Sequence, residues 1–154
     1  MVANDNAPGQ VVISGTKAAI DKATEIAKAK GIKRAMALNV SAPFHCALMQ
    51  PAADKMREAL AAVTIRPLAV PVVSNVTAVE TLEPETIRRL LVEQVTGRVR
   101  WRESVLVFRA LGVGTTVEAG GSKVLTGMVK RIDKELQTVT LDTPADIDAF
   151  VKTL

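Results

Sequence analysis

The sequence contains few aromatic residues, one cysteine and no long apolar run. Only 3% of its 154 residues are aromatic, which leaves few side chains for stacking single-stranded bases, so nucleic acid is not the expected partner despite a formal net charge of +4. The lone Cys46 excludes an internal disulfide, and the opening residues, MVANDN, lack the basic and apolar regions of a secretory signal. Apolar runs such as residues 11–13 are short, and none in the sequence is long enough to cross a bilayer. We therefore expect a cytoplasmic protein with no membrane-spanning segment.

Recognisable metal sites and nucleophile motifs are also missing. No Cys, His and Asp residues have the spacing of a metal site, and no serine lies in a complete Gly-x-Ser-x-Gly motif. Residues 120–122 match half of that motif, but Val124 replaces its closing glycine, and Ser122 is expected to cap a helix. Cys46 follows His45 directly, and neighbouring side chains point in different directions, which argues against a Cys–His pair. The sequence offers a base without an evident nucleophile.

Short apolar runs alternate with longer amphipathic ones, and this alternation predicts a mixed α/β fold. Strands are expected at about residues 11–14, 34–40, 70–74, 115–118 and 139–141, and helices at about 17–30, 48–63, 84–95, 101–111 and 122–136. A capping box at 143–146 predicts a last helix after it. The first 40 residues supply too few elements to cover their own sheet, so we expect them to expose apolar surface unless further chain packs on them.

His45 is the residue with the clearest chemical potential. A single histidine is usually a surface or core residue, but His45 follows a proline-fixed turn at the end of an expected strand and precedes a helix. Open α/β sheets place ligand-facing groups at such strand ends, which makes His45 a candidate general base. In the helix expected after Pro84, Gln94 lies seven residues after Ile87 on the same apolar stripe, so an inward-pointing amide is expected there.

Two groups of basic residues are candidates for binding an anionic partner. Lys123, Lys130, Arg131 and Lys134 lie opposite the apolar stripe of their expected helix, and Arg98, Arg100 and Arg102 surround Trp101. The ordinary interpretation is a solvated face, and the alternative is contact with an acidic protein or a phosphate-bearing ligand.

Five ordered motifs give the chain a family resemblance. They are NAPGQVVISG at 6–15, VSAPFHCALMQPAAD at 40–54, PVVSNV at 71–76, VRWRES at 99–104 and KVLTGMVKRI at 123–132. Together they resemble the malonyl-CoA:acyl-carrier-protein transacylases of bacterial fatty-acid synthesis and, less closely, the acyltransferase domains of polyketide synthases. Residues 119–122, AGGS, depart from the glycine-proline-glycine turn that is common in the family.

The resemblance implies an α/β-hydrolase-like domain with an inserted ferredoxin-like subdomain. Residues 1–40 would be part of the small ferredoxin-like subdomain and residues 41–154 the C-terminal part of the large one. The family moves malonyl from malonyl-CoA to a serine and then to the phosphopantetheine thiol of acyl-carrier protein, without a cofactor or metal. His45 matches the family base, and Gln94 matches the residue whose backbone carbonyl orients it. Phe44 matches a neighbour that favours malonyl over methylmalonyl, and Asn6 aligns near the active site.

The serine elbow, the malonyl-binding arginine and the oxyanion segment of the family have no counterpart in this sequence. We therefore expect the chain alone to be inactive, and we expect a complementary N-terminal chain to be a partner alongside acyl-carrier protein and a coenzyme A thioester. Three alternatives remain open at this point. One is a non-catalytic fragment that binds carrier protein or coenzyme A, another is a piece of a polyketide-synthase acyltransferase, and the third is a hydrolase that uses Cys46 or Ser122.

Overall fold

Regular elements alternate along the chain and form three separate two-stranded sheets. The computed structural model describes residues 1–153. The elements are β1 (Val2–Ala7), β2 (Gln10–Ile13), α1 (Lys17–Ala29), the short 3-10 helix η1 (Ala47–Met49), α2 (Gln50–Ala61), β3 (Val72–Val73), β4 (Glu80–Thr81), α3 (Pro84–Glu93), α4 (Trp101–Ala110), β5 (Thr115–Ala119), α5 (Val124–Ile132), β6 (Gln137–Leu141) and α6 (Pro144–Val151). The mixed α/β class expected from the sequence is confirmed. No helix within residues 1–153 combines the length and the apolar character that a bilayer span requires.

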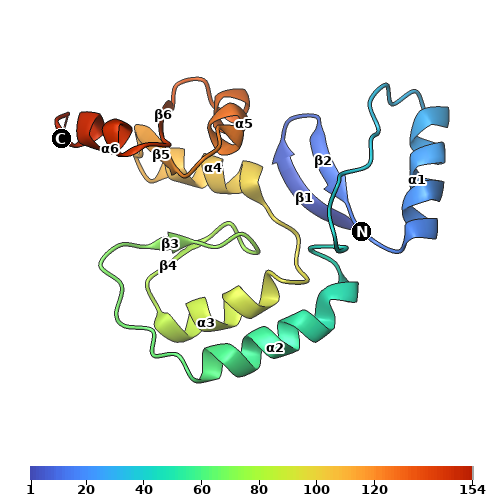
Figure 1. Cartoon of the computed structure of the whole chain (residues 1–154), viewed down its shortest axis with the longest axis horizontal. Helices are drawn as coiled ribbons and strands as arrows, with labels where there is room; N and C mark the ends of the chain where they lie inside the picture. The colour runs from blue at the N-terminus through green and yellow to red at the C-terminus, as the bar shows by residue number, and fades with distance from the viewer. Residues whose placement is uncertain (154) are drawn as a thin grey trace.

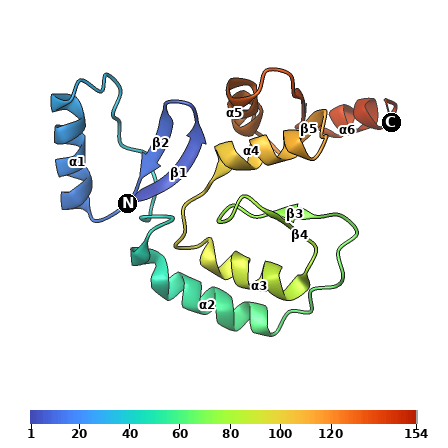
Figure 2. The ribbon, with the colours of Figure 1, turned by 180° about the vertical axis from the view of Figure 1, so that it is seen from behind.

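The N-terminal part consists of an antiparallel hairpin, β1–β2, and the helix α1, which stands apart from it (Figures 1 and 2). Thr16 caps α1 through its hydroxyl, as its place before the helix predicts, yet the helix contains no buried residue. The strand predicted at 34–40 is wrong for this chain, since these residues have no regular structure. A strand needs a neighbour for its backbone groups, and none of the described strands pairs with this segment.

Apolar side chains are exposed across this N-terminal part, as expected. Val11 on β2 is 62% exposed and Ile26 on α1 is 47% exposed. Met36, in the unpaired segment, is 67% exposed. Such surface is costly in water, because each buried side chain of this size is worth roughly 1.5–3 kcal/mol. Residues 1–40 therefore do not form a covered layer by themselves.

The middle of the chain is a pair of helices, α2 and α3, with the short ribbon β3–β4 beside them (Figure 1). Proline at the first helical turn starts both helices, where its missing N–H costs no hydrogen bond. Ala53 on α2 is buried, and so are Ile87 and Leu90 on the apolar stripe of α3. The strand predicted at 70–74 forms only over its centre, as β3.

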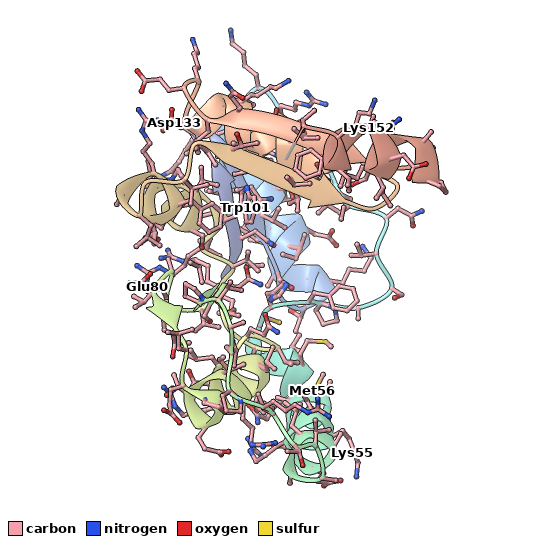
Figure 3. The ribbon with its side chains drawn as sticks, turned by 90° about the vertical axis from the view of Figure 1, so that its left-hand side faces the viewer. Lys55, Met56, Glu80, Trp101, Asp133 and Lys152 are labelled. Atoms are coloured by element: carbon pink, nitrogen blue, oxygen red, sulfur yellow. The ribbon has the colours of Figure 1, made fainter. Side chains whose placement is uncertain are left out.

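The C-terminal part holds the main apolar core. Val105 on α4, Val129 on α5 and Leu136 before β6 are almost completely buried, with Trp101 and Phe108 packed against them. Trp101 and Phe108 meet edge to face at a centroid distance of 6.1 Å, a favourable aromatic geometry. Strands β5 and β6 are parallel and are joined by α5. Figure 3 shows Trp101 in the midst of the side chains near the centre of the molecule.

Glu118, rather than the expected Ser122, caps α5. The Glu118 carboxylate accepts hydrogen bonds from the backbone amides of Leu125 and Thr126, at 3.2 and 2.7 Å, and from the Ser122 hydroxyl at 2.8 Å. These amides lack partners within the helix, so an anion there is doubly favoured by hydrogen bonding and by the helix dipole. The hydrogen bond from Thr126 is the main cause that lowers the Glu118 pKa to about 2. Ser122 therefore has a structural role outside the helix.

An ion pair and a backbone bridge join the hairpin to the rest of the chain. The Asp5 amide donates to the Val99 carbonyl at 2.8 Å, and the Val99 amide donates to the Ala3 carbonyl at 2.8 Å. The Nε–H of Arg102 on α4 is shared between the two Asp5 carboxylate oxygens, and Arg102 Nη2 donates a further hydrogen bond to Asp5 Oδ2. The hydrogen bond from Arg102 is the largest influence that lowers the pKa of Asp5. These contacts place β1 across the start of α4.

Candidate active site

His45 lies where the unpaired segment meets the helices α2 and α3. Its backbone is left-handed, with φ of 57°, a region that costs an L-residue about 1–2 kcal/mol. Pro43 stands two residues before it and η1 begins two residues after it, so His45 lies in a turn between the irregular segment and η1. This conformation aims the imidazole at the end of α3. A strained residue held by its surroundings is a frequent feature of functional sites.

Two backbone carbonyls hold one nitrogen of the His45 ring. Nδ1 lies 2.9 Å from the Gln94 oxygen and 3.2 Å from the Gly97 oxygen. Carbonyl oxygens only accept hydrogen bonds, so Nδ1 must carry the proton and share it between them. The neutral ring then has an unprotonated Nε2, which can take a proton from another group. The geometry therefore selects the tautomer that a general base needs.

The end of α3 positions both carbonyls. Gln94 is the C-cap residue, and its amide donates to Leu90 at 3.0 Å, while its own carbonyl is one of the last four that find no partner within a helix. The chain then turns, and the Gly97 amide donates back to the Glu93 carbonyl at 2.9 Å. A Cβ on Gly97 would lie 2.9 Å from the Glu93 oxygen and 3.3 Å from a Val76 methyl group. Only glycine fits this turn without moving it.

The Gln94 side chain adds a second anchor. Its Oε1 accepts a hydrogen bond from Asn75 Nδ2 at 3.0 Å, and the Asn75 carbonyl accepts from the Arg100 amide at 2.9 Å. The side chain thus points inward to the segment that follows β3, where the sequence pattern had placed it. Reasoning from sequence missed the parts played by Asn75 and Gly97. Asn75 lies in a quoted motif, and Gly97 follows the helix at a position typical of a C-terminal turn.

The structure does not bring all the expected site residues together. Phe44 precedes His45 and is 46% exposed, and Cys46 is buried with its thiol directed to the Pro43 carbonyl at 3.1 Å. Asn6 lies in β1 and is half-buried, and within residues 1–153 no hydrogen bond joins it to His45. The Cys46 thiol thus bonds to a backbone carbonyl and not to the His45 ring, which argues against a Cys–His pair.

The arginines around Trp101 form ion pairs with neighbouring carboxylates. Arg100 and Arg98 both bond to Glu103, and Arg102 bonds to Asp5. These contacts favour the solvated-face interpretation of this cluster over a phosphate site. Among residues 1–153, no group of three or more His, Cys, Asp or Glu side chains is placed to hold a metal ion.

Comparison with known proteins gives consistent matches along the whole chain. The chain is 45% identical over 153 residues to the malonyl CoA-acyl carrier protein transacylase of Bacillus subtilis, a match that covers 99% of this chain and 48% of that relative. It is 46% identical over 149 residues to the corresponding protein of Escherichia coli K12, covering 97% of this chain and 48% of that relative. The chain spans about half the length of the curated relatives it matches.

Solved structures agree with these relatives. The acyl-carrier-protein S-malonyltransferase of Bartonella henselae matches with a TM-score of 0.94 and 49% identity, over 99% of this chain and 49% of that one. A malonyl-transacylase solved in complex with its type II polyketide-synthase acyl-carrier protein matches with a TM-score of 0.93 and 41% identity, over 99% of this chain and 50% of that one. The expected resemblance is thereby confirmed. Residues 1–143 also match the family model of the acyl transferase domain, and the chain belongs to this family.

Proposed function

We propose that this chain supplies the general base of a malonyl transferase that moves malonyl from malonyl-CoA to acyl-carrier protein in fatty-acid synthesis. The observation that carries the proposal is the contact of His45 Nδ1 with two carbonyl oxygens, at 2.9 and 3.2 Å, which leaves Nε2 free to accept a proton. The matched relatives are transacylases and S-malonyltransferases by name. The reaction uses malonyl-CoA as a substrate and needs no cofactor.

In the proposed reaction His45 moves one proton back and forth. A serine hydroxyl gives its proton to Nε2 while its oxygen attacks the malonyl thioester carbon, and the coenzyme A sulfur leaves and takes that proton. The carrier-protein thiol then gives its proton to Nε2 and attacks the acyl-serine, and the serine oxygen leaves and recovers the proton. During each step the imidazolium lies against the C-terminus of α3, whose partial negative charge stabilises a cation.

The serine belongs to the half of the domain that this chain does not span. None of the serines in the sequence lies in a complete Gly-x-Ser-x-Gly motif, so the chain alone should not form an acyl-enzyme. We propose a complementary chain or segment as the source of the nucleophile. The finer fold assignment is part of the same proposal: residues 1–40 belong to a ferredoxin-like subdomain and residues 41–154 to an α/β-hydrolase-like one.

Substrate and partner choice follow from the same site. Phe44 stands beside His45, where a large side chain leaves less room for an α-methyl branch, and this favours malonyl over methylmalonyl. Asn6 is proposed as a substrate neighbour on family grounds. Acyl-carrier protein is the proposed acceptor, and a match to a transacylase solved with its carrier protein supports it. The proposed location is the cytoplasm.

Reconstitution tests the proposal. The chain is mixed with the half of the Bartonella henselae enzyme that has no counterpart here, and malonyl transfer to acyl-carrier protein is followed by intact mass. We expect transfer in the mixture, none from the chain alone, and a loss of at least 100-fold in His45→Ala. Lys55→Ala is the control, since Lys55 is exposed on the outer side of α2 (Figure 3). Undiminished transfer in His45→Ala, or a malonyl adduct on Cys46 or Ser122 of the chain alone, would contradict the proposal.

A further inference from the structure

The loop between β3 and β4, residues 74–79, contacts both of the residues that hold the imidazole. Asn75 Nδ2 donates a hydrogen bond to the Gln94 side-chain oxygen at 3.0 Å. The next residue, Val76, packs against Gly97, since its two methyl groups lie 3.3 and 3.4 Å from the place that a Cβ on Gly97 would take. The β3–β4 loop thus supports both ends of the turn that carries the two carbonyls.

The β3–β4 loop is closed by its own backbone. The Ser74 amide donates to the Val79 carbonyl at 3.2 Å, and the Ala78 amide donates to the Ser74 carbonyl at 2.8 Å. Ala78 is buried and has a left-handed backbone, with φ of 52°. Within residues 1–153, His45 is the only other residue besides glycine that has a positive φ. Such conformations persist only where the surroundings fix them, and they are concentrated at functional sites.

Arg100, which directly precedes α4, fixes the position of the β3–β4 loop. Its amide donates to the Asn75 carbonyl at 2.9 Å, and its Nη1 donates to the Thr77 carbonyl at 3.0 Å. Glu103 accepts a hydrogen bond from Arg100 Nε at 2.9 Å and so restrains the guanidinium. The β3–β4 ribbon itself lies between α3 and α4 (Figure 1). With its backbone held at two carbonyls, the loop keeps the Asn75 side chain directed at Gln94.

We propose that the β3–β4 loop positions the base of the proposed reaction and that Asn75 is the positioning residue through which it acts. The inference rests on the proposed function, because it assigns a task to residues around the same imidazole. Gln94 is the C-cap of α3, and its carbonyl lies 2.9 Å from His45 Nδ1. Helix ends fray, so a side-chain anchor at this residue restricts the direction in which its carbonyl points.

The direction of the Gln94 carbonyl matters because it decides which ring nitrogen carries the proton. A neutral imidazole can be protonated at either nitrogen, and the acceptor beside Nδ1 selects one form. When this carbonyl turns away, part of the population carries the proton on Nε2 and cannot act as a base. Asn75 contacts Gln94 and not the ring, so its loss should lower kcat and leave KM unchanged.

Asn75→Ala tests the inference in two measurements. Nitrogen-15 NMR of the imidazole is recorded on the full chain alone, where the ratio of Nε2-protonated to Nδ1-protonated ring should rise about tenfold, the effect of losing one hydrogen bond. Malonyl transfer is measured with the unmatched half of the Bartonella henselae enzyme, where kcat should fall about tenfold and KM should stay within about twofold. Thr77→Ala is the matched control in the same loop, because the Thr77 carbonyl and not its hydroxyl binds Arg100.

Two further variants separate the hydrogen bond from a general loss of structure. Gln94→Met removes the same bond from its other partner but keeps the backbone carbonyl, so it should have the same effect. The double variant should lose about tenfold in kcat and not about a hundredfold, because one bond can be lost only once. Asn75→Asp should stay within about threefold of the native values, since the Gln94 amide can turn and donate to the carboxylate.

Circular dichroism checks that each variant is folded, and Gln94→Met carries the test if Asn75→Ala is not. A native tautomer ratio in the folded variants, additive losses in the double variant, a change in KM in place of kcat, or an equal loss in Asn75→Asp would overturn the inference. Absence of transfer from the unmutated mixture would contradict the proposed function, and the tautomer ratio then decides this inference by itself.

Discussion

Replacing His45 by glycine should leave the chain more stable than replacing it by alanine, against the usual order of these residues. His45 has φ of 57°, where an L-residue pays about 1–2 kcal/mol that glycine avoids. Glycine loses about 0.5–1 kcal/mol more than alanine through its freedom in the unfolded chain. The difference should favour His45→Gly by roughly 0.5–1 kcal/mol. Both variants lose the same Nδ1 contacts with the Gln94 and Gly97 carbonyls, so these losses cancel in the comparison.

Urea denaturation followed by circular dichroism measures this difference in the free energy of unfolding. The comparison holds when both variants have the same dependence of that free energy on urea concentration. The matched control is Lys55 in the middle of α2, whose side chain is 80% exposed. There the order should reverse, with Lys55→Gly less stable than Lys55→Ala by about 1 kcal/mol. If His45→Gly were also less stable than His45→Ala, the left-handed conformation would not be a strained feature of the native chain, and the reasoning would fail.

Three further changes test the surroundings of the site. Gly97→Ala should destabilise the chain by about 1–3 kcal/mol, because its Cβ would meet the Glu93 oxygen at 2.9 Å. The displaced turn should also loosen the contacts of His45 Nδ1, which changes the NMR spectrum of the imidazole. An unchanged imidazole spectrum would contradict this. Asp5 has a lowered pKa through its hydrogen bond with Arg102, so its contribution to stability is complete above the ordinary carboxyl pKa of 3.8 and is lost as pH falls through the lower folded value. Acid titration of stability should therefore be shallower in Asp5→Asn, and an identical profile would argue against the pair. Glu118→Gln should increase hydrogen exchange at the Leu125 and Thr126 amides, which the Glu118 carboxylate binds. In the unmutated chain, protection of these amides should fall as pH drops from about 4.5 to about 2, because Glu118 becomes protonated. Amides that stay protected at pH 2 would exclude Glu118 as the cap.

Local patterns were sufficient for several elements. The capping box at Thr143 and Asp146 forms as its residue types indicate, with the Asp146 amide bonded to the Thr143 hydroxyl at 3.2 Å. Pro84 begins α3, and the stripe from Ile87 correctly placed the Gln94 amide inward. These features depend on residues within one or two helical turns of each other. Sequence spacing therefore predicts them directly.

Other features depend on partners that spacing does not show. Strand β1 was missed because its centre, Asn4 to Asn6, is polar and its pairing depends on β2 and Val99. The strand expected at 34–40 has the right alternation but lacks a neighbour, and a strand without one does not form. Ser122 looked like a cap, yet the Glu118 carboxylate reaches the same helix end from β5 with a full charge. The role of Gly97 depends on its contact with Val76, which is 21 residues away in the chain.

The protonation site of the His45 ring tests the central claim most directly. The chain contains a single histidine, so nitrogen-15 NMR of the imidazole has only one residue to report. With the ring neutral, the two carbonyl contacts predict a protonated Nδ1 and an unprotonated Nε2. A neutral ring protonated at Nε2 would contradict the account, because His45 could not then accept a proton from a serine or a thiol.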